Sequence, residues 1–251
     1  MSRTLFLTFT LLLVALLGSS AHADPAADLR AMSLYRGFAE QPFVFDLTVS
    51  TFRGGKQVGP TQQSSVYFRD FDAVLVDFSA PASYAGRRIL FSGQQMWMAL
   101  PSSSRSVRIS AADRLMGDAS NGDILNIDPA RYTATALADE TLKGVAYKRI
   151  SAVANDARVL YPRVDFLLEP GSNRPYRSYH FAASGKVLKV AQYMRFAEDG
   201  GHQRLSQLLL VDPANGGNYT LMQFDNYRTA ELPAGMFAQS AIRNPLHLGG
   251  E

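Results

Sequence analysis

The dominant pattern in this sequence is an alternation of apolar and polar residues in short segments, which turn-forming residues separate. The first such segment begins at Phe43 and is followed by the turn Gly54-Gly55. Successive side chains of a strand point to opposite faces of a sheet, so this alternation indicates strands with one buried face. The apolar side of the first segment has Phe43, Phe45, Leu47 and Val49, and the polar side has Asp46, Thr48 and Ser50.

Further segments of this kind bring the predicted number of strands to about eleven. Strands of this type that meet in short turns form a sandwich, a closed barrel or a strongly curved open sheet. The further segments are Val66–Asp70, Ala73–Ser79, Arg87–Ser92, Gln95–Leu100, Lys143–Val153, Val159–Glu169, Pro175–Phe181, Val187–Phe196, Arg204–Val211 and Tyr219–Tyr227.

Two segments outside these strands indicate helices. In residues 24–40 the apolar residues Met32, Tyr35 and Phe38 lie three apart, as on one stripe of an amphipathic helix, and Pro42 ends the pattern. The alanine-rich residues 129–138 follow an Asp128-Pro129 cap, which predicts a second short helix.

The stretch from Met96 to Asp128 separates the two blocks of strands. It begins as a strand around Trp97, and Pro101 ends this strand because proline cannot donate a ladder hydrogen bond. Two small apolar clusters follow at helical spacing, and such short helices are stable only when they pack on an apolar surface. These clusters contain Leu115, Met116, Ile124, Leu125 and Ile127.

The helical segments decide between the possible architectures, because the concave side of a curled sheet offers them an apolar surface. We therefore predict a mainly β fold with short helices (α+β). Its curved antiparallel sheet forms a half-open, incomplete β-barrel, covered by the N-terminal helix and by a central helical insert. A membrane barrel fits less well, since its strands need about 9 to 11 residues each and several segments here are shorter.

The N-terminus has the three parts of a secretory signal peptide. Arg3 supplies a positive charge, Leu5 to Leu17 is an almost unbroken apolar run, and Ala21-His22-Ala23 is a small-residue cleavage site. The run is shorter than the roughly 20 residues that span a bilayer, which disfavours an uncleaved anchor. We expect residues 1–23 to be a signal peptide and residues 24–251 to be one exported domain without stable membrane insertion.

Composition argues against several classes of function. The chain has no cysteine, which excludes thiol catalysis, thiolate zinc sites, disulfides and a lipid-modified cysteine. A formal net charge of +3 without a basic block argues against nucleic-acid binding. His180, His202 and His247 are not at metal-ligand spacing, and no common hydrolase or nucleotide-binding motif occurs. We expect no enzyme, no metal and no cofactor, with His180 as a structural histidine.

A short motif runs through the central stretch. A strand with tryptophan that ends before proline is followed by two arginines and an isoleucine, and then by a glycine-aspartate segment. The residues are Met96–Pro101, Arg105–Ile109, Leu115–Asp118 and Asn121–Ile124, and Leu232-Pro233 and Phe237 close the chain. This motif resembles the outer-membrane lipoprotein-sorting proteins of the LolA-like superfamily. The chain departs from the family pattern around the glycine-aspartate, where Met116 and Asn121-Gly122 replace the usual phenylalanine and tyrosine.

The resemblance implies a periplasmic carrier, soluble and monomeric, whose half-open barrel shields the acyl chains of a lipoprotein or lipid between membranes. An inner-membrane transporter and an outer-membrane acceptor are the partners it implies. A chain of roughly 16 carbons costs about 12 kcal/mol to leave in water, so a carrier needs an apolar cavity with a movable cover. The glycine-containing central stretch is the natural moving part.

The candidate lipid-binding residues come from the apolar strand faces and from the central stretch. Ordinary core packing is the alternative interpretation for each of them, and solvation is the alternative for the candidate rim or partner residues Arg105 and Arg108. We expect Leu125→Glu or Trp97→Glu to weaken lipid retention more than folding. The candidates are Phe43, Phe45, Leu47, Val76, Phe78, Phe91, Trp97, Met98, Leu115, Met116, Ile124 and Leu125.

Three hypotheses for the function follow. The first is a periplasmic lipid or lipoprotein carrier, and the second is a sensor of the same fold that holds a lipid as a signal to a membrane partner. The third is an exported β protein with a solid core and a structural or adaptor role. The carrier and the sensor differ in whether they hand over their cargo, and the third has no cavity.

Overall fold

A single antiparallel sheet of thirteen strands forms nearly the whole computed structural model, which describes residues 24–37, 41–113, 119–125, 127–156 and 159–244. The order of strands is β6-β5-β4-β3-β2-β1-β13-β12-β11-β10-β9-β8-β7, so β6 and β7 are the two edges and the sheet is not closed. The strands are β1 Phe43–Arg53, β2 Lys56–Asp70, β3 Ala73–Ala80, β4 Arg88–Ser92, β5 Gln95–Ala99, β6 Val107–Ile109, β7 Tyr132–Leu142, β8 Val145–Ala154, β9 Arg163–Leu168, β10 Pro175–Phe181, β11 Val187–Asp199, β12 His202–Val211 and β13 Tyr219–Thr229.

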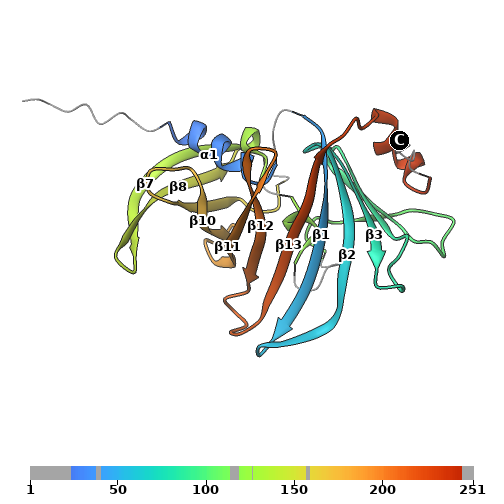
Figure 1. Ribbon diagram of the computed structural model, residues 1–251, viewed down its shortest axis with the longest axis horizontal. Coiled ribbons are helices and arrows are strands. Elements are labelled where there is room, and N and C mark those ends of the chain that lie inside the picture. Colours follow the sequence, from blue (N-terminus) through green and yellow to red (C-terminus); the bar gives the residue numbers. More distant parts are fainter. Residues whose placement is uncertain (1–23, 38–40, 114–118, 126, 157–158, 245–251) are drawn as a thin grey trace, which may run out of the picture.

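The sheet is strongly twisted and curled. Strands β1, β2 and β13 run down the view of Figure 1, whereas β7, β8 and β10 lie across it. Such curvature follows from the right-handed twist of neighbouring strands, accumulated over a long ladder. The fold is therefore mainly β, as predicted.

The predicted number of strands was too low, because the sequence patterns of β6 and β7 are weak. Strand β6 has only three residues and pairs only with β5. Strand β7 includes most of the segment predicted as an alanine-rich helix, of which only the 3-10 helix Pro129–Arg131 is helical. Asp128 caps that turn as expected, with its side chain accepting from the amide of Ala130. Pairing with β8 along the following residues outweighs the helix propensity of alanine.

Helix α1 (Pro25–Leu34) is shorter than the predicted residues 24–40. It starts at an Asp24 cap with proline at the first position, and it ends before Gly37, whose φ of 80° is outside the helical region. Phe38, the last residue of the predicted stripe, lies outside the described residues. Leu29 and Met32 pack the helix onto β7, β8 and β9 in the helix cluster, whose buried members are Leu29, Met32, Ile127, Tyr132, Ile150, Ala152, Tyr161, Val164, Phe166 and Leu168.

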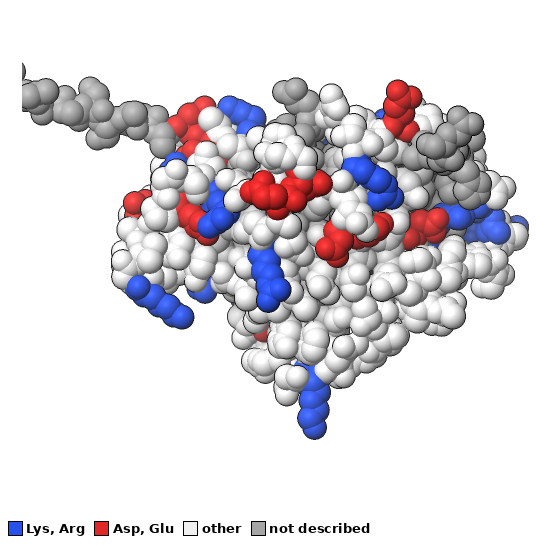
Figure 2. All heavy atoms as spheres, in the orientation of Figure 1, with Lys and Arg blue, Asp and Glu red and all other residues white. Residues whose placement is uncertain are grey.

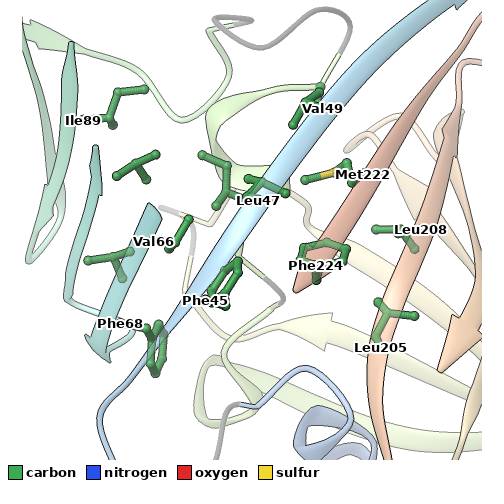
Figure 3. Close-up of a cluster of buried hydrophobic side chains, with 14 of the residues drawn as sticks. Phe45, Leu47, Val49, Val66, Phe68, Ile89, Leu205, Leu208, Met222 and Phe224 are labelled. Atoms are coloured by element: carbon green, nitrogen blue, oxygen red, sulfur yellow. The ribbon is translucent and has the colours of Figure 1, made fainter. Parts of the chain in front are cut away.

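The concave face of the other half of the sheet is apolar. Figure 3 shows its side chains projecting to one side of β1, β2, β12 and β13. This concave cluster consists of Phe43, Phe45, Leu47, Val49, Val66, Phe68, Val74, Val76, Phe78, Ile89, Phe91, Met96, Ala119, Ile124, Ala191, Tyr193, Leu205, Leu208, Leu210, Met222 and Phe224.

The central segment, residues 110–131, connects edge strand β6 to edge strand β7. Ala119 and Ile124 of this segment belong to the concave cluster and Ile127 to the helix cluster, so the segment crosses the concave side. The predicted central helical insert is not an α-helix in the described part of this segment, where the helical elements are the 3-10 helices Asn121–Asp123 and Pro129–Arg131. Its apolar clusters are too short to close several helical turns, and polar contacts hold the segment instead.

The opposite, convex face is covered by the C-terminal segment after β13. This outer cluster consists of Val44, Ala73, Leu75, Leu90, Ala99, Leu232, Met236, Phe237 and Ile242, with Trp97 packed against it. The 3-10 helix Ala234–Phe237 follows Leu232-Pro233 in this segment. Strands β1, β3 and β4 are thus buried on both faces.

Charges of both signs are mixed on the surface. Figure 2 shows acidic and basic side chains across the upper part of one face and few charges over its lower part. No helix in the described residues is long and apolar enough to cross a membrane.

Candidate functional site

A pocket lies between the concave face and the central segment. Its walls include Phe91 and Met96 from one half of the sheet and Leu208 and Leu210 from the other, and Leu125 belongs to the part of the central segment that covers it. Its volume is about 180 Å³. Ligand pockets for small molecules usually have about 300–1,000 Å³, and an apolar cavity of about 150 Å³ holds one benzene. The pocket therefore has room for only part of an acyl chain while the central segment is in place.

The predicted lipid-binding residues fall into groups. On the concave side, Phe91 and Leu125 line the pocket, and Met98 lies opposite Ile89 of the concave cluster. Trp97 lies on the other face, with the outer cluster. Leu115 and Met116 are outside the described residues, and Arg105 and Arg108 are exposed. The candidates buried within the concave cluster are Phe43, Phe45, Leu47, Val76, Phe78 and Ile124.

Arg36 fixes the central segment from the N-terminal side. Its Nη2 donates a hydrogen bond of 2.7 Å to the carbonyl oxygen of Ile124, and its guanidinium lies 4.5 Å from the ring centre of Phe224. The side chain is 4% exposed, and burial lowers the pKa of its guanidinium. Arginine stays charged in proteins, so a buried cation holds this turn against the concave cluster.

A buried ion pair fixes the same turn from the opposite side. Lys189 of β11 contacts Asp123 of the central segment, and its Nζ donates to Ser120 Oγ over 3.0 Å. The hydroxyl of Tyr161 donates to Asp123 Oδ1 over 2.6 Å. Burial alone would raise the pKa of Asp123, but Lys189 and the hydrogen bonds from Tyr161 and Ser120 lower it. Asp123 is therefore a carboxylate in the folded protein.

His180 lies beside this ion pair and lines the pocket. Its ring is 4.5 Å from that of Tyr161, and its Nε2 is 3.0 Å from Ser178 Oγ. Burial lowers the pKa of His180 to about 4, an effect that Asp123 opposes and Lys189 reinforces. The imidazole is therefore neutral near pH 7.

The Ser178–His180 contact does not have the arrangement of a hydrolytic site. Ser178 is fully buried, so a substrate cannot reach its hydroxyl. Among the described residues no hydrogen-bond partner for His180 Nδ1 is found, whereas a base that activates a serine is oriented by a third group. Nowhere in the described residues are three His, Asp or Glu side chains placed to hold a metal ion.

A polar cleft adjoins the pocket and shares Gly93, Gln94 and Arg131 with it. Arg131 pairs with Asp128 over 3.1 Å and with Asp72, in the turn between β2 and β3, over 2.5 Å. This bond joins the start of edge strand β7 to the far half of the sheet. The end of the central segment is thus also held by charge.

Sequence reasoning missed these polar contacts, and one of them had a detectable signal. Lys189 shares the inward parity of Ala191 and Tyr193 on β11, so alternation already placed a lysine on the buried face. A buried lysine requires a partner, which indicates an acidic residue facing it. Arg36 and Asp123 carry no comparable signal, because both lie outside regular strands.

Comparisons with known proteins agree on the fold. A LolA superfamily protein from Nitrosomonas europaea superposes with a TM-score of 0.77 at 24% identity, covering 85% of this chain and 97% of its own. A DUF1329 family protein from Desulfovibrio piger superposes with a TM-score of 0.72 at 22% identity, covering 87% of this chain and 99% of its own. A domain from Vibrio parahaemolyticus, proposed to sort outer membrane lipoproteins, superposes with a TM-score of 0.72 at 14% identity. The match covers 87% of this chain and 98% of that domain. No curated protein matches the chain.

The protein has the LolA-superfamily fold, as the sequence motif predicted. A family model described as an uncharacterized protein matches residues 70–244, and the chain belongs to that family.

Proposed function

We propose that the protein is a periplasmic carrier that binds acyl chains of a lipoprotein or lipid on its concave face, beneath the central segment. The observation that carries this proposal is the way the segment is held. It lies across a large apolar surface and is fixed by Arg36, by the Lys189–Asp123 pair and by the Arg131–Asp72 bond. Polar contacts of this kind can exchange for water when the segment moves, whereas the apolar surface beneath it needs another apolar cover.

In this proposal the described arrangement, with the central segment over the concave face, is the closed state of the carrier. Burial of one CH₂ group is worth about 0.8 kcal/mol, so a chain of roughly 16 carbons gains about 12 kcal/mol when it is fully covered. This gain exceeds the cost of breaking a few buried polar contacts at about 1–3 kcal/mol each. Acyl chains therefore displace the segment from the concave face, and the segment returns when a membrane or an acceptor covers the chains instead.

Export of the chain completes the proposal. Residues 1–23 are a signal peptide, and residues 24–251 act as one non-catalytic domain in the periplasm. An inner-membrane transporter as donor and an outer-membrane protein as acceptor are the partners this role requires. A fold match to a domain proposed to sort outer membrane lipoproteins supports the role.

Native mass spectrometry of protein purified from periplasm tests ligand binding. We expect an adduct with the mass of a lipid or acylated protein, which organic solvent removes. Transfer of a labelled lipoprotein between donor and acceptor liposomes then separates a carrier from a sensor, because a sensor retains its ligand. Protein that carries no adduct, and that takes up none from liposomes, would contradict the proposal.

Arg36→Met is expected to raise lipid affinity about tenfold or more, because the lost hydrogen bond to Ile124, worth about 1.5–3 kcal/mol, stabilises only the closed state. Methionine keeps the contact with Phe224, so folding is affected less than binding. Titration with a fluorescent fatty acid measures the effect. Arg30→Met is the matched control, since Arg30 is an exposed residue of helix α1, which ends two residues before Arg36. Equal affinities of Arg36→Met and the wild type would show that the bond does not oppose binding.

Leu125→Glu is expected to lower the affinity for the same fatty acid at least tenfold, because the carboxylate enters the apolar pocket wall. Leu125 is only half-buried, so the melting temperature falls by a few degrees at most. Leu188→Glu, at an exposed position of β11, serves as the control for the added charge. Loss of folding without loss of affinity in the remaining folded molecules would identify Leu125 as a core residue only.

A further inference from the structure

Three polar side chains lie close together on the largely apolar concave face. Gln62 of β2, Thr51 of β1 and Thr220 of β13 share this face with the concave cluster. Thr220 lies opposite Thr51 on one side and opposite Leu210 on the other, and Gln62 lies opposite Val49. Their exposed fractions are 8% for Gln62 and Thr51 and 0% for Thr220.

In the part of the chain that the structure describes, two of these side chains have polar atoms for which no partner is found. Among the described residues, no hydrogen-bond partner is found for the buried Gln62 Oε1 or for the buried Thr220 Oγ1. An unsatisfied buried polar atom costs about 1–3 kcal/mol, and native proteins keep few of them. Valine at position 220 and leucine at position 62 would fill similar volumes without this cost. Stability therefore does not account for the polar row, whereas a ligand would.

The row is continuous with the pocket. Leu210 lines the pocket, and Thr220 is its neighbour across the ladder, about 5 Å away at the spacing of adjacent strands. Thr51 lies one strand further along. A ligand that extends from the pocket over the concave face therefore reaches the row once the central segment has moved.

We propose that the Gln62–Thr51–Thr220 row binds the polar linker of the lipid, so that the protein selects lipids whose acyl chain is joined to a hydroxyl-bearing or amide group. The Gln62 oxygen accepts a hydrogen bond, so the linker must offer an O–H or N–H donor. The Thr220 hydroxyl both donates and accepts, which a hydroxyl or an amide also matches. A bare ester lacks the donor. This inference rests on the proposed function and adds the class of ligand to it.

Competition between two matched probes tests the selection. 1-Palmitoylglycerol carries hydroxyl donors beside the same acyl chain that methyl palmitate carries with an acceptor-only ester. Each probe is titrated against the protein with bound 1-anilinonaphthalene-8-sulfonate, a dye that fluoresces at apolar surfaces. One net hydrogen bond corresponds to about a fivefold change in affinity, so the wild type is expected to favour the glycerol lipid by about 5- to 25-fold.

Variants assign this preference to the row. Gln62→Leu is expected to reduce it about fivefold and to leave the affinity for methyl palmitate unchanged, because an ester offers Gln62 Oε1 no donor. Thr220→Val also removes a donor to the ester carbonyl, so it is expected to lower the affinity for both probes, and more for the glycerol lipid. Thr220→Ser keeps the hydroxyl and the preference. Thr48→Val is the matched control, because Thr48 lies on the opposite face of β1.

The outcomes separate the two proposals. Equal binding of both probes by the wild type overturns the selection and leaves lipid binding intact, as does an equal loss of both probes in Thr220→Val and Gln62→Leu. In either case the hydrogen-bond partners of Gln62 Oε1 and Thr220 Oγ1 are buried water molecules and not a lipid. Failure of both probes to displace the dye or to bind in native mass spectrometry overturns the proposed function and the selection together.

Discussion

Replacement of Lys189 with methionine is expected to lower the free energy of unfolding by about 3 kcal/mol or more, because it leaves Asp123 as a buried carboxylate without its cation. Tyr161 and Ser120 still donate to Asp123, which keeps the loss near the lower end of the range known for broken buried pairs. Methionine fills a similar volume, so the effect reports charge and not packing. Urea denaturation at pH 7 measures it.

Two further variants control this experiment. Lys186→Met changes an exposed lysine just before the same strand and is expected to change stability by less than about 0.5 kcal/mol. The double variant Lys189→Met with Asp123→Leu is expected to recover much of the loss, since apolar replacement of a whole buried pair is often neutral. A loss below about 1 kcal/mol in Lys189→Met would show that the pair contributes little to the docking of the central segment.

His180 is expected to make the protein about 3 kcal/mol less stable at pH 4 than at pH 6.5, because the surroundings of this half-buried imidazole disfavour its charged form. Its pKa is about 4 in the folded state, against an ordinary value of 6.5. Between these values the unfolded chain binds a proton that the folded chain does not bind, so stability falls with pH. Above pH 6.5 the contribution is complete, and below pH 4 no more is lost.

The pH profile of His180→Asn tests this assignment. Urea denaturation from pH 7.5 to pH 4 should give a flatter profile for this variant than for the wild type. His202→Asn, at an exposed position, should retain the wild-type slope. Asp123 also faces this region, but its pKa lies below its ordinary value, so its loss of charge falls at the acid end of the range. Parallel profiles of wild type and His180→Asn would exclude His180 as the titrating group.

Strand alternation made much of the fold predictable. Phe43, Phe45, Leu47 and Val49 were expected on one face of a strand, and they share the concave cluster. The prediction of a helix at residues 129–138 was wrong for most of this segment, which forms strand β7. Alanine has high helix propensity, whereas the pairing that makes the segment a strand comes from β8. The predicted length of helix α1 was wrong because the apolar spacing that includes Tyr35 continues in the sequence beyond Gly37, where the backbone leaves the helical conformation.

The candidate site was less predictable. Apolar character identified which strands face the interior, but it does not tell a filled interior from a hollow one, and the pocket of about 180 Å³ lies between these extremes. Trp97 was assigned to the cavity from its place in a motif, whereas the strand parity of β5 puts Met96 inward and Trp97 outward. The contacts of Arg36 and Lys189 join residues 88 and 66 positions apart in the chain, which local patterns do not reveal.

The central segment is attached to both edges of one open sheet, so additional length at one end would let it lift further from the concave face. Separation of strand β6 from β5 costs less free energy than separation of β7 from β8. Only the pairs Met96–Ile109, Trp97–Arg108 and Met98–Val107 join β6 to β5, whereas β7 is paired with β8 along most of its length. Peeling of this three-residue strand would lengthen the tether and widen the entrance on one side only. Cargo would then enter and leave from the β5 margin, and a bulkier cargo would need more of the ladder there to come undone.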